Sequence, residues 1–135
     1  MSNFEKFTQK KFKSATKPLA TITKDKLLNF NAAAMINTIK DMQYAVLYYD
    51  RGNSLIGIKF TNKSTPEAYR IRKFRRDKLG IISVTSFLRY YNIEHPKTLT
   101  YTMEWDAEEN MNIIDLKEHR RKKENEVKKE SELPL

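Results

Sequence analysis

The strongest structural signal in the chain lies in residues 44–60, which read YAVLYYDRGNSLIGIKF. Tyr44 to Tyr49 is a nearly continuous apolar run of residue types that favour strands. Leu55 to Phe60 is a second such segment, with its large apolar side chains at alternate positions. Between the two, Asp50 to Asn53 supplies turn residues, and Gly52 and Asn53 can both adopt positive φ. This stretch therefore predicts a β-hairpin.

Two amphipathic helices are predicted, one on each side of the hairpin. Each has apolar residues at i, i+3, i+4 and i+7, the spacing that gives a helix one apolar face. These positions are Ala32, Met35, Ile36 and Ile39 in the first helix and Val84, Phe87, Leu88 and Tyr91 in the second. Asn31 and Ser83 precede the two stripes and can act as N-caps. We expect the first helix to run to about Asp41 and the second to end before Pro96.

Four further segments are predicted as strands: 21–23, 68–74, 98–105 and 111–116. The segment 98–105 alternates strictly between apolar and polar residues, as a half-buried antiparallel strand does. The apolar set expected on its buried face is Leu99, Tyr101, Met103 and Trp105.

The order strand, helix, three strands, helix, two strands predicts an α+β fold. We expect a single small domain over residues 19–116, a mostly antiparallel sheet with two helices packed on one face. Residues 1–18 are expected to form a flexible basic arm. Residues 117–135 are charged throughout and are expected to be a frayed helix or a disordered tail.

Several functional classes are excluded by composition. The 135 residues include no cysteine, so disulfides, thiol nucleophiles and thiolate zinc sites are excluded. No apolar run approaches the roughly 20 residues of a membrane span, which favours a cytoplasmic protein. There is no glycine-rich phosphate loop and no nucleophile elbow. We therefore expect no enzymatic activity, no cofactor and no metal, and interpret the acidic residues 104–109 as a solvated turn.

The charge of the chain is unevenly distributed. The formal net charge is +9, and residues 1–26 and 63–80 each contribute a local +5, from seven basic and two acidic residues. Residues 99–116 have the opposite sign, with five acidic and no basic residues. This asymmetry predicts a molecule with a basic side and an acidic edge.

The segment 68–74 and the residues that follow it form the main candidate site. The two-residue period of a strand sends Arg70, Arg72 and Phe74 to one face and their neighbours to the other. Arginines about 7 Å apart on a strand suit successive phosphates of a nucleic acid. Phe74 could stack on a base of a single strand. In the alternative interpretation this is a solvated sheet face whose arginines pair with acidic neighbours such as Glu104.

The resulting functional prediction is a non-enzymatic protein that binds DNA or RNA with low sequence selectivity, because phosphate contacts do not read bases. The predicted contact residues are Arg70, Arg72, Lys73, Phe74, Arg75, Arg76, Lys78, Lys10, Lys11 and Lys13. The alternative prediction is a small regulatory module that binds a protein partner through its acidic edge or an apolar surface, which could also serve as a homodimer interface.

Overall fold

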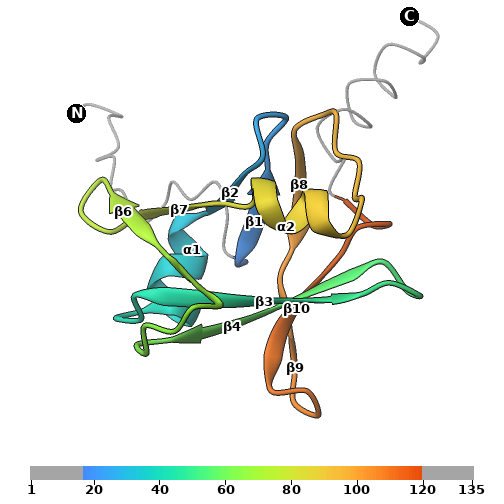
Figure 1. Ribbon diagram of the computed structural model, residues 1–135. Coiled ribbons are helices and arrows are strands. Elements are labelled where there is room, and N and C mark those ends of the chain that lie inside the picture. The colour runs from blue at the N-terminus through green and yellow to red at the C-terminus, as the bar shows by residue number, and fades with distance from the viewer. Residues whose placement is uncertain (1–16, 120–135) are drawn as a thin grey trace, which may run out of the picture.

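The computed structural model describes residues 17–119 and shows two five-stranded antiparallel sheets with short helices (Figure 1). The prediction of a small, mostly antiparallel domain is confirmed. The prediction of one sheet with two helices on one face is wrong, because the strands divide between two sheets. No helix within residues 17–119 is long and apolar enough to cross a membrane.

The first sheet has the strand order β6-β7-β2-β1-β8. Its strands are β1 (Leu19–Ile22), β2 (Leu27–Phe30), β6 (Arg72–Phe74), β7 (Leu79–Ser83) and β8 (Leu99–Thr102). Neither β2 nor β7 was predicted. A strand of four or five residues is too short to display a clear two-residue period. Both are held by their neighbours, since β2 pairs with β1 on one side and with β7 on the other.

The second sheet has the strand order β5-β3-β4-β10-β9. Its strands are β3 (Tyr44–Asp50), β4 (Leu55–Thr61), β5 (Ala68–Arg70), β9 (Glu104–Asp106) and β10 (Met111–Asp115). The predicted hairpin is confirmed, with β3 and β4 paired from Tyr44 opposite Thr61 to Asp50 opposite Leu55. Its turn differs from expectation, because Ser54 adopts the positive φ of 57° and Gly52 and Asn53 do not.

The first predicted helix is present but short. Asn31 caps α1 (Ala32–Ala34) as predicted, because its Oδ1 accepts a 2.9 Å hydrogen bond from the backbone N–H of Ala34. The chain then continues as a π-helix, η1 (Met35–Ile39), and stops at Lys40 rather than Asp41. The wider π turn, in which Lys40 N–H bonds to the Met35 carbonyl, changes the predicted stripe: Ile36 is 59% exposed.

The second helix, α2 (Thr85–Tyr90), buries Phe87 and Leu88 as its apolar stripe predicts. Ser83 does not cap it, because that residue is the last of β7. The residue at the N-cap position is Val84, which is buried and makes no capping hydrogen bond with its side chain.

Two segments predicted as single strands cross from one sheet to the other. The segment 68–74 is β5 in the second sheet and β6 in the first, and the segment 99–106 is β8 in the first and β9 in the second. The residue at each crossing is buried: Ile71 is 2% exposed and Met103 is 4% exposed. The alternation of apolar and polar residues continues through each crossing, so it does not indicate where one strand ends.

One hydrophobic core joins the two sheets. The first sheet contributes inward residues of β1 and β2, and the second contributes inward residues of β4 and β10. Phe30 of β2 and Phe60 of β4 meet edge to face across the sheets, with ring centroids 5.5 Å apart. Burial of alternate residues on β1, β2 and β10 is the pattern expected for strands that cover one core.

Candidate nucleic-acid interface

The predicted basic segment forms an edge strand in each sheet. β5 is the first strand of one sheet order and β6 is the first strand of the other, so the two edges are built by consecutive residues. Edge strands have one side without a neighbouring strand, which leaves it open to solvent or to a ligand. The segment therefore lies at the periphery of the fold, where a large charged polymer can approach it.

Exposure alternates along this segment as predicted. Arg70, Arg72 and Phe74 are exposed, with Phe74 43% exposed, while Ile71 is buried. Tyr69 is partly buried, and its hydroxyl lies 3.3 Å from Oγ of Ser86 on α2. Ile71 and Tyr69 thus anchor the inner side of the backbone that carries the outward arginines.

The basic surface continues into the turn between β6 and β7, where Arg75, Arg76 and Lys78 are all exposed. Three consecutive residues of this turn, Arg75, Arg76 and Asp77, have left-handed φ values of 55°, 56° and 65°. This conformation costs non-glycine residues about 1–2 kcal/mol each. The turn is closed by the Lys78 N–H, which donates to the carbonyls of Phe74 and Arg75 at 3.0 and 3.1 Å.

Lys73 points inward relative to the arginines and is half-buried. Its Nζ donates a 3.4 Å hydrogen bond to the carbonyl of Lys40, the residue that ends η1. This contact places the exposed Lys40 beside the basic segment. Sequence reasoning missed Lys40, because nothing in residues 31–41 indicates that the end of the helix meets β6.

None of these cations is neutralised by a carboxylate within residues 17–119, where the only ion pair joins Lys117 to Asp115 at 2.9 Å. The alternative in which the arginines pair with Glu104 is wrong. Glu104 lies on β9, and β5 and β9 are at opposite edges of the same sheet. The charges at the β5 and β6 edges are therefore available to an external anion.

The acidic residues of segment 99–116 lie on β9, in the turn that follows it and at the end of β10, and β9 is the edge strand opposite β5 in the second sheet. Asp106 closes the turn after β9, because its Oδ1 accepts hydrogen bonds from the N–H groups of Glu108 and Glu109 at 2.9 and 3.1 Å. Across residues 17–119 no three His, Asp or Glu side chains are placed to share a metal ion. Trp105 was predicted to be buried, but it is 59% exposed.

His95 is a structural residue of the core. It is 5% exposed, and its Nε2 shares a 2.7 Å hydrogen bond with the hydroxyl of Tyr101. Burial lowers the pKa of His95 below its usual 6.5 and raises the pKa of Tyr101 to about 12. The pair is enclosed and lies far along the chain from the basic segment, so it adds nothing to that surface.

The remaining predicted contact residues, Lys10, Lys11 and Lys13, lie outside the described residues. Comparison of the chain with protein-family models, with curated proteins and with solved structures finds no match.

Proposed function

We propose that this protein binds nucleic acid without catalysing a reaction, and that the β5 and β6 edges with the β6–β7 turn contact the phosphate backbone. The observation that carries the proposal is the group of exposed cations on these elements, none of which has a carboxylate partner within residues 17–119. Placing so many like charges together is unfavourable in isolation and becomes favourable when a polyanion neutralises them.

The types of side chain support a phosphate ligand. Arginine presents a planar fork of donors that binds phosphate oxygens in pairs, and Arg70 and Arg72 both point outward from the segment. Phe74, two residues after Arg72 on β6, offers an exposed aromatic ring on which a base can stack. Contacts of this kind position a polymer but do not read its sequence, so low selectivity is expected.

The position of the acidic segment supports the same proposal. Glu104 and Asp106 lie on β9, the edge strand farthest in strand order from β5, so their negative charge is kept away from the proposed contact surface. A polyanion is attracted to one side of such a molecule and repelled by the other, which orients the protein during encounter.

The test measures binding of the full chain to labelled single- and double-stranded DNA and RNA across a series of salt concentrations. The informative variant is Arg70→Ala/Arg72→Ala. The matched control is Lys24→Ala/Lys97→Ala, which removes the same charge from two exposed positions next to the β8 edge. Both variants have the same net charge, so any difference in their binding reports the position of the removed charges.

We expect affinity to fall steeply with salt for the unmodified chain. Each phosphate contact contributes about 0.9 to the logarithmic salt slope on duplex DNA and about 0.7 on single strands. Loss of two contacts should reduce the slope by about 1.4 to 1.8, while the control should keep the slope. Equal slopes in the two variants, or no binding at low salt, would overturn the proposal and turn attention to a protein partner of the acidic edge.

A further inference from the structure

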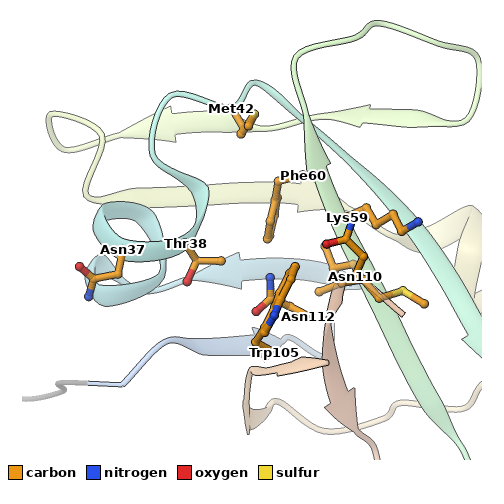
Figure 2. A pocket seen from close by; sticks show the side chains of 10 residues that line it. Asn37, Thr38, Met42, Lys59, Phe60, Trp105, Asn110 and Asn112 are labelled. Carbon is orange, nitrogen blue, oxygen red and sulfur yellow. The ribbon is translucent and has the colours of Figure 1, made fainter. Parts of the chain in front are cut away.

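A pocket of about 440 Å³ lies between η1 and the second sheet (Figure 2). The side chains that matter for its chemistry are Asn37, Thr38, Lys59, Phe60, Trp105 and Asn112. They come from η1, β4, β9 and β10, so tertiary structure brings them together from distant parts of the sequence. The volume falls within the range of roughly 300–1,000 Å³ that is usual for small-molecule sites.

Strand register explains how the wall of the pocket forms. Asn112 on β10 lies opposite Ile58 of β4 on one side and opposite Trp105 of β9 on the other. Residues paired in this way share one face of the sheet. Exposure rises along the row, from 0% at Ile58 through 7% at Asn112 to 59% at Trp105. The row thus runs from the core to an exposed indole at the mouth of the pocket.

Asn112 is the unusual member of this row. It occupies an inward position on β10, where the alternating pattern of a core strand calls for an apolar residue. More than nine-tenths of the residue is buried, and it lines the pocket. Figure 2 shows Asn112 lying between Phe60 and Trp105. A carboxamide offers both hydrogen-bond donors and an acceptor, so an asparagine in the lining is suited to meet the polar edge of a ligand.

The charge of the lining indicates which part of a ligand fits inside. Within residues 17–119, Lys59 is the only charged residue that lines the pocket. Its ammonium lies over the ring of Tyr48, 5.5 Å from the ring centroid, and Figure 2 shows the side chain directed away from Trp105. The interior therefore suits a neutral group, because Lys59 lies opposite Val46 of β3, on the other face of the sheet from Ile58 and Asn112.

We propose that the pocket binds the base of one nucleotide, with the face of the base against Trp105 and its hydrogen-bonding edge on the amide of Asn112. A base is planar, apolar on its faces and polar on its edge. An exposed indole beside a carboxamide matches that combination. Duplex DNA hides its bases within the stack, so the site takes a free nucleotide or a base of a single strand.

This proposal deepens the proposed function and rests on it for the single-strand source of the base. The two surfaces are linked through the end of η1. Lys73 contacts the carbonyl of Lys40, and Met42, two residues farther along, lines the pocket. A single strand held at the basic edge can follow this route to place a base against Trp105.

The first experiment uses the single tryptophan of the chain as a reporter of its own site. The full chain is titrated with adenosine 5′-monophosphate, uridine 5′-monophosphate and ribose 5-phosphate, while tryptophan fluorescence is recorded. We expect saturable quenching by both nucleotides and none by ribose 5-phosphate. Equal quenching by ribose 5-phosphate, or no saturable quenching by either nucleotide, would overturn the assignment of a base to this pocket.

The second experiment compares Asn112→Leu with Tyr90→Ala, which removes an exposed aromatic ring outside the pocket. Binding of a labelled single-stranded 12-mer is followed by fluorescence anisotropy, and the melting temperature of each variant is measured. We expect Asn112→Leu to weaken 12-mer binding by about tenfold, to abolish quenching by mononucleotides and to leave the melting temperature unchanged or higher. A lower melting temperature with unchanged binding would show that Asn112 only supports the fold, and would overturn the proposal.

The two proposals fail in different ways. If Asn112→Leu leaves 12-mer affinity and its salt slope unchanged while Arg70→Ala/Arg72→Ala reduces both, the pocket proposal is wrong and the proposed function stands. If mononucleotides quench Trp105 but the 12-mer does not bind, the proposed function is wrong and the pocket binds free nucleotides. Tighter binding of the 12-mer than of either mononucleotide, lost in both variants, supports both proposals.

Discussion

The segments 68–74 and 99–106 have the same architecture and opposite charge. Each leaves one sheet and enters the other at a single buried residue, and each supplies an edge strand to both sheets. Segment 68–74 carries Arg70, Arg72 and Phe74 outward at alternate positions and leads into a basic turn. Segment 99–106 leads into an acidic turn. In such a segment the inward residues specify the crossing, and the outward residues are free to specify a ligand.

The two crossings are packed differently. Ile71 and Met35 lie directly over Gly80 of β7, so closely that a Cβ at that position would lie 3.1 Å from Cγ2 of Ile71. Beside Met103, by contrast, Tyr101 shares a buried hydrogen bond with His95. The basic crossing is therefore packed closely by apolar side chains, and the acidic crossing has a buried titratable pair beside its apolar packing.

The largest expected effect comes from truncation of the two crossing residues. Ile71→Ala and Met103→Ala should each lower the free energy of unfolding by about 2–5 kcal/mol, because both side chains are buried and leave cavities. The measurement is urea denaturation, with one slope of the free energy of unfolding against urea concentration used for both variants. A cost below about 1 kcal/mol for either variant would break the equivalence of the two crossings.

A smaller effect is expected from Gly80→Ala. The added methyl group would overlap Met35 and crowd Ile71, so overpacking should lower the free energy of unfolding by about 1–3 kcal/mol. The matched control is Gly52→Ala, because Gly52 is exposed and a Cβ there meets only Asp50 at 3.7 Å. Equal stability of Gly80→Ala and the control in thermal denaturation would show that the basic crossing is loosely packed.

The acidic side should also be the more sensitive to pH. The pKa of His95 is lowered below 6.5 by burial, so below pH 6.5 the unfolded chain binds more protons than the folded protein. The stability that comes from the neutral form of His95 is complete above pH 6.5 and is lost as the pH falls from 6.5 through the lowered pKa of the folded protein. Above pH 10 the raised pKa of Tyr101, about 12, predicts a second loss of stability.

The measurement is the free energy of unfolding between pH 7.5 and 5, where ordinary carboxylates have not yet titrated. His95→Gln should have a flatter profile than the unmodified chain, whatever its absolute stability. Arg72→Ala, on the basic side, should keep the original profile. A profile that stays equally steep in His95→Gln would assign the pH dependence to another group.

The smallest effect is expected from neutralising the acidic edge. Glu104→Gln/Glu108→Gln removes two exposed charges that repel phosphates from a distance, so binding of single-stranded DNA should tighten by about twofold at low salt. The gain should disappear at about 0.15 M salt, where the Debye length is about 8 Å. A gain that persists at that ionic strength would place the acidic edge in contact with the nucleic acid.

Local sequence patterns were enough to predict several features of this protein. The β3–β4 hairpin, the Asn31 cap and the outward placement of Arg70, Arg72 and Phe74 all follow from interactions within a few residues. Hydrogen bonds of a cap and the two-residue period of a strand need no knowledge of distant segments. The basic surface, for the same reason, was visible in the sequence.

Tertiary structure alone decided where the strands divide between two sheets and what their edges meet. Alternation persists through Ile71 and Met103, so only pairing with β3, β7, β1 and β10 separates the strands there. The exposure of Trp105 and the burial of Asn112 depend on that pairing, since β9 is an edge strand and β10 is not. Long-range strand partners are chosen by the packing of the whole core, which local sequence does not encode.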